Sequence, residues 1–140
     1  MRTRLVLMLV GGVLLATLPA RAHHSFAAEF DVNQPVTLNG TLTKMEWLNP
    51  HGWIYIDVAQ PDGKVVNWAI EAGAPTALLR RGLRKTDFPA GIEVVAEGYR
   101  AKGGAPRANG KTVKFKDGRN FFLGASDAPA AEGAPAARPQ

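Results

Sequence analysis

Alternating hydrophobic and polar positions in the middle of the chain predict a β-hairpin. Residues 53–58 and 66–71 form two short runs in which every second side chain is apolar. The apolar positions are Ile54, Ile56 and Val58 in the first run and Val66, Trp68 and Ile70 in the second. A turn signal, Pro61-Asp62-Gly63, lies between them. Because successive side chains of a strand point to opposite faces, the pattern indicates two paired strands with one buried face.

The preceding segment, residues 36–48, alternates in the same way but changes parity part-way. Leu38 and Leu42 share one parity, whereas Met45 and Trp47 share the other. A one-residue slip would move the apolar side chains of a strand to its other face. We therefore expect a β-bulge or a sharp bend inside this strand.

One short helix and two further strands follow. Pro75 suits a first helical position, residues 76–81 include Leu78 and Leu79, and Gly82 suits the residue after the last turn. Strands are expected over residues 92–99 and 111–116, with a Gly- and Ala-rich loop at 102–110. Asp117-Gly118-Arg119 then turns the chain before a short apolar end at 121–123.

The order of these elements predicts the fold class. Three strands, a helix and two strands, with a strongly bent first strand, is the order of an OB fold. We expect an all-β protein with one short helix, arranged as a five-stranded OB-like barrel, because closure hides the sheet edges. A small β-sandwich of similar strand content is the alternative.

The first 22 residues have the layout of a signal peptide. Arg2 and Arg4 precede an apolar run, residues 5–18, and Ala20-Arg21-Ala22 supplies small residues before a cleavage site. His23 is then the expected mature N-terminus. The apolar run is shorter than the roughly twenty residues that span a bilayer. We expect a soluble periplasmic protein with no membrane span after cleavage; an uncleaved anchor is the alternative.

The chain contains no cysteine, and its other end, residues 125–140, is rich in Ala and Pro and predicted to be a disordered tail. Residues 23–124 remain for one domain with an N-terminal arm.

Of the 17 basic residues three lie in the leader, while all 12 acidic residues lie beyond it. The mature chain therefore carries 14 positive against 12 negative charges, a balance of +2. Export and this low charge argue against a nucleic-acid partner.

Basic residues gather in one segment, residues 100–119. Its Lys and Arg residues are Arg100, Lys102, Arg107, Lys111, Lys114, Lys116 and Arg119, with Asp117 as the segment's one acid. Such a run can attract polyanions or an anionic membrane surface. A solvated hairpin face is the simpler interpretation, and we favour it.

Four stretches carry a family resemblance: HHSFAAEFD, VTLNGTLTKMEWLNPHGWIYIDV, NWAIEAGAPTALLRRGL and VVAEGYRAKGG. They resemble a family of small exported bacterial proteins classed as a domain of unknown function. A His-rich mature start and a Trp-x-Asn-Pro-His motif recur in that family. The resemblance implies a periplasmic protein with one compact β-domain, and it carries over no substrate or catalytic residue.

The three histidines are the candidate metal ligands. A mature N-terminal His23 offers its free amine and its ring, His24 adds a second ring, and His51 lies in the loop between the first two strands. Imidazole and amine nitrogens suit copper or zinc. Glu29 or Asp31 is a candidate to complete the site. The alternative is an exposed N-terminal tail, with His51 capping a turn beside the neighbouring tryptophans.

Aromatic side chains suggest a second kind of site. If Ile54 and its partners face the core, Trp53 and Tyr55 emerge on the opposite face, and with Trp47 and Asn49 they form a candidate ligand-binding set for a small organic ligand or a periplasmic protein. The alternative is that a curved strand, or the N-terminal segment with its two phenylalanines, covers the rings.

Catalysis is not expected. With no cysteine and with Ser25 and Ser126 as the two serines, both outside the predicted strands, the usual nucleophilic triads are excluded from the domain. Asp57 and Glu71 lie on adjacent predicted strands where they can face each other, but carboxylates on an outer sheet face are usually just solvated.

Overall fold

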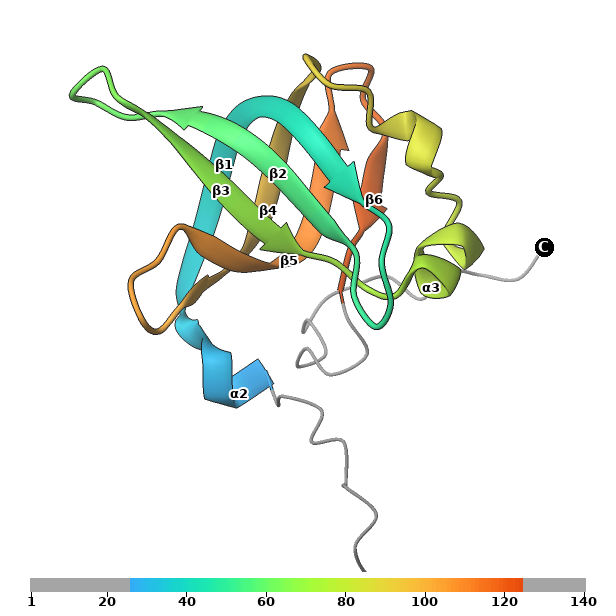
Figure 1. Cartoon of the computed structure of the whole chain (residues 1–140), viewed down its shortest axis with the longest axis horizontal. Helices are drawn as coiled ribbons and strands as arrows, with labels where there is room; N and C mark the ends of the chain where they lie inside the picture. Colours follow the sequence, from blue (N-terminus) through green and yellow to red (C-terminus); the bar gives the residue numbers. More distant parts are fainter. Residues whose placement is uncertain (1–25, 125–140) are drawn as a thin grey trace, which may run out of the picture.

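The computed structural model describes residues 26–124 and shows a mostly β protein with short helices (Figure 1). The predicted leader (1–22) and tail (125–140), and with them His23 and His24, lie outside the described residues. The elements are α2 (Phe26–Glu29), β1 (Phe30–Glu46), β2 (Trp53–Ala59), β3 (Val65–Glu71), α3 (Pro75–Arg80), a 3-10 turn (Lys85–Asp87), β4 (Glu93–Ala101), β5 (Arg107–Phe115) and β6 (Asn120–Phe122).

The strands form one six-stranded sheet whose hydrogen bonds ring through five strands. The order is β3-β2-β1-β4-β5-β6, and β3 also pairs with β5. All neighbours in that order are antiparallel, whereas the β3–β5 pairing that joins the two sides is parallel. Figure 1 shows β1 curling across the molecule so that it borders strands on both sides.

The parity change predicted in the first strand is confirmed as a β-bulge. In the pairing of β1 with β2 the register shifts between Leu42 and Lys44. Leu38 and Leu42 before the shift and Met45 after it are all buried. The extra residue therefore keeps both halves of a bent strand facing the same core.

The predicted hairpin is confirmed with its buried face. Ile54 pairs with Ile70 and Ile56 with Trp68, and these four side chains lie in the core. The predicted helix is also present as α3, with Pro75 at its start and Leu78 buried. Gly82 follows it with a φ of 86°, a conformation that glycine adopts without the steric cost of a Cβ.

Three details of the fold prediction were wrong. A second short α-helix, α2, precedes β1, and a sixth strand, β6, extends the sheet beyond the expected five. The expected loop at residues 102–110 is too long, because β4 runs to Ala101 and β5 begins at Arg107. The start of β5 is a strand because it pairs with β3, a contact between segments far apart in the sequence.

Among the described residues, no helix is long and apolar enough to cross a membrane.

Candidate functional site

His51 lies in the connection between β1 and β2, one residue after a cis peptide bond between Asn49 and Pro50. The loop is tied to the end of β3, since Gly52 N–H donates to the Gly73 carbonyl at 3.1 Å and Ala72 N–H donates to the Gly52 carbonyl at 2.8 Å. These backbone bonds bring the loop histidine beside the last residue of β3.

The imidazole of His51 contacts the carboxylate of that residue, Glu71. Nδ1 of His51 contacts Oε1 of Glu71, whose side chain is only 9% exposed, while the His51 side chain is 27% exposed. The second carboxylate oxygen accepts a bond from Nδ2 of Asn109 at 3.5 Å. We call His51, Glu71 and Asn109 the Glu71 cluster.

Backbone pairing places the Glu71 cluster at the junction that joins the ring of strands. Glu71 is the register partner of Asn109 in the parallel β3–β5 pairing, and of Trp53 in the β2–β3 pairing. Gly110 leaves room beside it, because a Cβ there would lie 2.9 Å from the Glu71 carbonyl oxygen. Oδ1 of the buried Asn109 has no hydrogen-bond partner in the structure. A carboxylate is thus held inside the protein with one edge of an imidazole against it.

Burial of Glu71 is the feature that the sequence reasoning missed. The alternation of β3 assigns Glu71 the outward parity of Asn67 and Ala69, which predicts exposure, yet Glu71 is buried. The His51 loop and β5 cover it. The expected facing of Asp57 and Glu71 does not occur, since Asp57 pairs with Asn67 and accepts its side-chain amide at 2.7 Å.

The candidate carboxylate ligands near the N-terminus have other partners. Glu29 accepts a bond from Nη2 of Arg107 at 3.4 Å. Asp31 accepts the backbone N–H of Asn33 at 2.9 Å, which lowers the pKa of Asp31. Within residues 26–124, no three His, Cys, Asp or Glu side chains lie close enough to hold a metal ion.

Trp53 and Tyr55 lie half-buried on the outward side of β2, as predicted, but both rings have partners. The Arg107 guanidinium lies over the Trp53 ring, 5.1 Å from its centroid. The Tyr55 hydroxyl donates to the Glu46 carboxylate at 2.9 Å, and the Lys44 ammonium lies 4.3 Å from the Tyr55 ring centroid. Burial raises the pKa of the Tyr55 hydroxyl, and the bond to Glu46 raises it further, so Tyr55 remains a donor.

The other two residues of the predicted ligand-binding set differ in burial. Trp47 packs against the hydrophobic core, whereas Asn49 is exposed in the loop. The N-terminal phenylalanines do not stack on Trp53 or Tyr55. Phe26 instead makes an edge contact with Tyr99 at 5.5 Å and a tilted contact with Phe30 at 5.8 Å. The arm reaches Trp53 indirectly, through the Glu29 contact with Arg107.

The comparison with protein families agrees with the quoted motifs. A family model described as a family of unknown function, DUF6152, matches residues 12–111. The chain belongs to this family. Neither a curated protein nor a solved structure matches the chain. Membership in DUF6152 brings no activity with it, so function must be argued from the residues.

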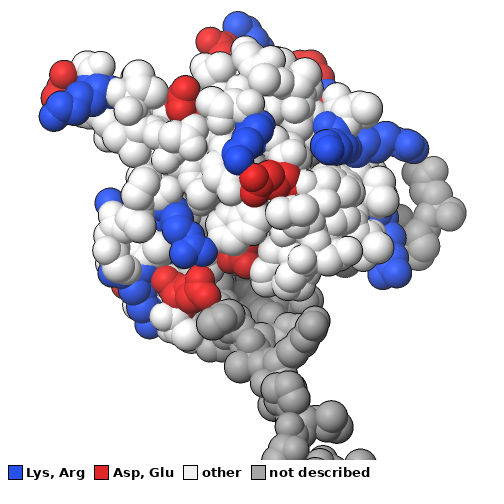
Figure 2. Space-filling model, in the orientation of Figure 1, with Lys and Arg blue, Asp and Glu red and all other residues white. Residues whose placement is uncertain are grey.

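The basic segment of this DUF6152 protein is partly neutralised within residues 26–124, since three of its seven basic residues pair with acids there: Arg107, Lys116 and Arg119. Lys116 pairs with Glu93 at 2.9 Å, and Arg119 pairs with Asp87 at 2.6 Å. The Lys102 ammonium donates to the Ala27 carbonyl at 2.6 Å. Figure 2 shows acidic and basic side chains next to each other at several places on the face in view. These contacts favour a solvated, internally paired surface over a polyanion site.

Proposed function

We propose that this protein is a small periplasmic binding or accessory protein that binds a transition metal, copper or zinc, through His51 and the mature N-terminal His23 and His24. The observation that carries the proposal is the contact between His51 Nδ1 and the buried Glu71 carboxylate. Histidines that bind metals commonly donate their other ring nitrogen to a carboxylate, which fixes the tautomer and the orientation of the ring.

The Glu71 cluster supplies that arrangement before any metal binds. With Nδ1 directed at Glu71, Nε2 of His51 is the nitrogen that can act as a ligand. An adjacent negative charge also makes the imidazole a stronger electron donor. His23 would add its amine and ring, and His24 a second ring, giving the nitrogen-rich set that copper and zinc prefer.

Strand connectivity supports an OB-like barrel as the scaffold. The ring runs β1-β2-β3-β5-β4 and back to β1, and α3 lies between β3 and β4 in the sequence. The β1–β2 loop, which holds His51, is a ligand-binding loop in OB folds. A small sandwich accounts less well for hydrogen bonds that continue around five strands.

The remaining parts of the proposal rest on the sequence. The leader-like first 22 residues support export to the periplasm as a soluble protein. The absence of a cysteine and the positions of the two serines favour a binding role over an enzymatic one. The low mature charge and the pairing of Lys116 and Arg119 with acids favour a non-nucleic-acid partner.

Metal titration of the mature protein beginning at His23 tests the proposal. Copper and zinc salts are titrated by calorimetry into the wild type, His23→Ala and His51→Ala, and each substitution is expected to weaken binding. Glu71→Gln keeps the side-chain volume but removes the carboxylate, and is expected to weaken binding by roughly 10-fold to 100-fold. Asp62→Asn, in the exposed β2–β3 turn, is the charge-matched control. Micromolar or weaker affinity that neither histidine substitution changes would contradict the proposal.

A small organic ligand or a periplasmic protein on the Trp53 and Tyr55 face is the second candidate. Its support is that both rings lie on the side of β2 away from the core and are half-buried, so part of each ring can contact a ligand. The Arg107 contact with Trp53 gives this face a cation beside an aromatic ring, a combination common in binding sites. A ligand here would alter Trp53 fluorescence without depending on His51, which separates it from the metal proposal.

A further inference from the structure

The outer surface of the sheet carries a pocket at the end of β2 away from His51. Its cavity volume is about 680 Å³, and strands β1, β2, β4 and β5 all contribute to its lining. That volume lies within the roughly 300 to 1,000 Å³ range of small-ligand sites. His51 precedes the first residue of β2, whereas Asp57 and Ala59 at the other end of β2 line the pocket. The pocket and His51 therefore lie at opposite ends of β2.

A change of strand partner at Thr41 accounts for the hollow. β1 pairs with β4 up to Thr41 and with β2 from Thr41 onward. Beyond Asp57, β2 therefore leaves β1, and the two strands diverge as a fork. Gly40 allows the close crossing at the base of this fork, since a Cβ there would lie 2.5 Å from the Asp57 carbonyl oxygen.

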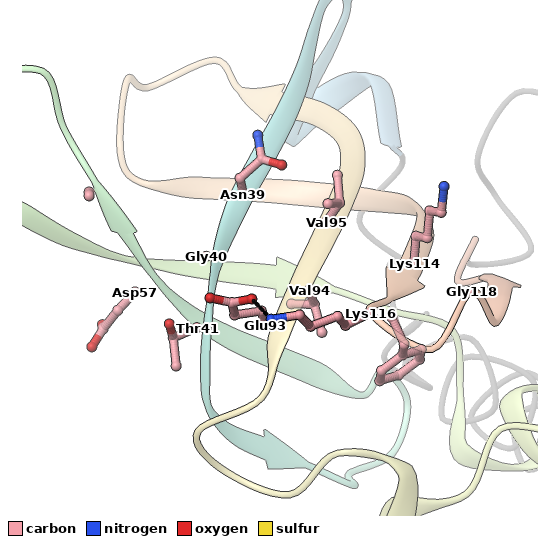
Figure 3. A pocket seen from close by; sticks show the side chains of 12 residues that line it. Asn39, Gly40, Thr41, Asp57, Glu93, Val94, Val95, Lys114, Lys116 and Gly118 are labelled. Atoms are coloured by element: carbon pink, nitrogen blue, oxygen red, sulfur yellow. Dashed lines mark hydrogen bonds and ion pairs between the residues drawn. The ribbon is translucent and has the colours of Figure 1, made fainter.

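Charge is distributed unequally across the pocket. Figure 3 shows Asp57 on one side and Lys114 on the other, with Glu93 and Lys116 paired between them. Glu93 lies toward Asp57, and the stem of Lys116 extends toward the Lys114 side. The Lys116 ammonium itself lies against Glu93, so the charges of the lining that this pair does not balance are Asp57 at one end and Lys114 at the other.

Neutral groups complete the lining. Asn39 and Thr41 offer an amide and a hydroxyl on β1, and Val95 lies between Asn39 and Lys114 in the strand register. Amide and hydroxyl groups can bond to a peptide-like backbone, and an apolar surface can take a short side chain. The pair that crosses the pocket is highly exposed, at 81% for the Lys116 side chain and 67% for Glu93, so it can separate readily to admit a ligand.

We propose that this pocket binds a short peptide with free ends, with its ammonium group at the Asp57 and Glu93 end and its carboxylate at the Lys114 end, where Lys116 can join once it separates from Glu93. A ligand of one charge would meet repulsion at one end of the pocket, whereas a dipolar ligand finds an opposite charge at both. This site is separate from the proposed metal site and does not depend on it.

The test uses trialanine and two blocked forms, one N-acetylated and one C-amidated. Each peptide is titrated into isotopically labelled mature protein, and backbone amide resonances are followed by NMR. Free trialanine is expected to produce saturable shifts at Asn39, Val95 and Lys114. Removing one end charge is expected to weaken binding by about tenfold, the factor that corresponds to one charge-assisted contact. Equal binding of the three peptides, or shifts that do not saturate, would overturn the proposal.

Substitutions locate the two charges. Lys114→Gln and Asp57→Asn are each expected to weaken trialanine binding by about tenfold, and Asp57→Asn keeps an oxygen for its bond from Asn67. Lys64→Gln and Asp62→Asn make the same charge changes in the exposed β2–β3 turn and are expected to leave binding unchanged. The spectra report folding of every variant at the same time. Equal losses in the pocket and turn variants would refute a specific site.

Discussion

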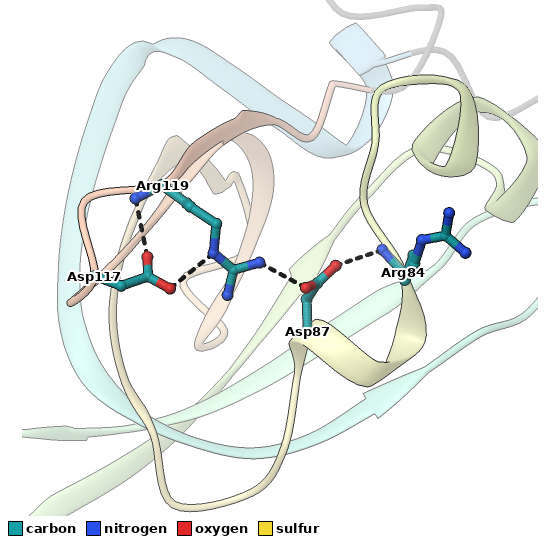
Figure 4. Close-up of polar contacts among 4 residues, drawn as sticks. All are labelled: Arg84, Asp87, Asp117 and Arg119. Atoms are coloured by element: carbon teal, nitrogen blue, oxygen red, sulfur yellow. Dashed lines mark hydrogen bonds and ion pairs between the residues drawn. The ribbon is translucent and has the colours of Figure 1, made fainter.

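Two groups of polar side chains in this protein, each built around a carboxylate, lie in opposite surroundings. In the Glu71 cluster, Glu71 and Asn109 are buried where β3 meets β5, and His51 is half-buried beside them. The second group, which we call the Arg119 cluster, consists of Arg84, Asp87, Asp117 and Arg119 and joins two surface turns (Figure 4). Its Arg119 side chain is 45% exposed and its Asp117 side chain 54%, against 9% for Glu71.

The Arg119 cluster has more polar contacts than the Glu71 cluster. Arg119 binds Asp117 through Nε at 2.7 Å and Asp87 through Nη1 at 2.6 Å, and Asp87 also accepts the Arg84 backbone N–H at 2.7 Å. Water can replace any of these partners when one is lost. No such replacement is available to a buried carboxylate, so fewer contacts are expected to matter more.

Glu71→Ala is expected to have the largest effect on stability. It leaves His51 and Asn109 without their shared carboxylate and opens a cavity, at a cost of about 3 kcal/mol in the free energy of unfolding. Urea unfolding at neutral pH measures the loss. Glu71→Gln, which keeps the volume and one acceptor, is expected to lose less. A cost for Glu71→Ala below about 1 kcal/mol would show that burial does not determine how much the Glu71 contacts contribute to the free energy of unfolding.

Asp87→Ala is expected to have a smaller effect, about 1 kcal/mol, although it removes contacts to two residues. The Asp87 side chain is 18% exposed, so solvent replaces part of what is lost. Asp87→Asn is the matched control, because it keeps an acceptor for the Arg84 N–H while removing the charge that Arg119 binds. If Asp87→Ala proved as costly as Glu71→Ala, the comparison between the clusters would fail.

Acid pH is expected to remove the charge-dependent part of the Asp87 contribution. Burial raises the pKa of Asp87, but the Arg119 guanidinium and the Arg84 N–H lower it more, so the folded pKa lies below its usual value. The stabilisation is therefore present above the unfolded pKa, about 4, and is lost as the pH falls through the folded pKa.

The difference in unfolding free energy between wild type and Asp87→Asn measures this effect. We expect that difference to be full at about pH 5 and to shrink below about pH 4. A difference that stays constant over this range would mean that the Arg119 contact contributes nothing that depends on charge.

Lys64→Gln is expected to have the smallest effect. Lys64 pairs with Asp62 at 3.1 Å in the β2–β3 turn, but the two side chains are 80% and 54% exposed. The thermal midpoint should match that of the wild type, because solvent already surrounds both groups. A clear fall in the midpoint would indicate that exposed pairs carry stability in this protein, which would weaken the contrast drawn with Glu71.

Much of the fold followed from local pattern. The alternation in residues 53–58 and 66–71 identified the hairpin and its buried face, and the parity change between Leu42 and Met45 identified the bulge. Pro75 and Gly82 marked the ends of α3. Such features depend on the period of a strand or on the backbone preferences of single residues, so neighbouring positions suffice to reveal them.

The sequence predicted one residue of the Glu71 cluster, His51, but neither of the other two. His51 stood out because histidine is rare in this chain and follows Asn-Pro in a loop. Glu71 did not, since its parity placed it among exposed residues, and Asn109 lay in an expected loop.

Tertiary structure alone decided that these three residues meet. The parallel pairing of Glu71 with Asn109 joins segments on either side of α3 and β4, and the backbone bonds of Gly52 bring the His51 loop over the same point. Sequence determined the β2–β3 hairpin, the bulge in β1 and the apolar faces of these strands, because those depend on local periodicity. Closure of the ring decided which polar group becomes buried, because burial depends on what distant segments place above it.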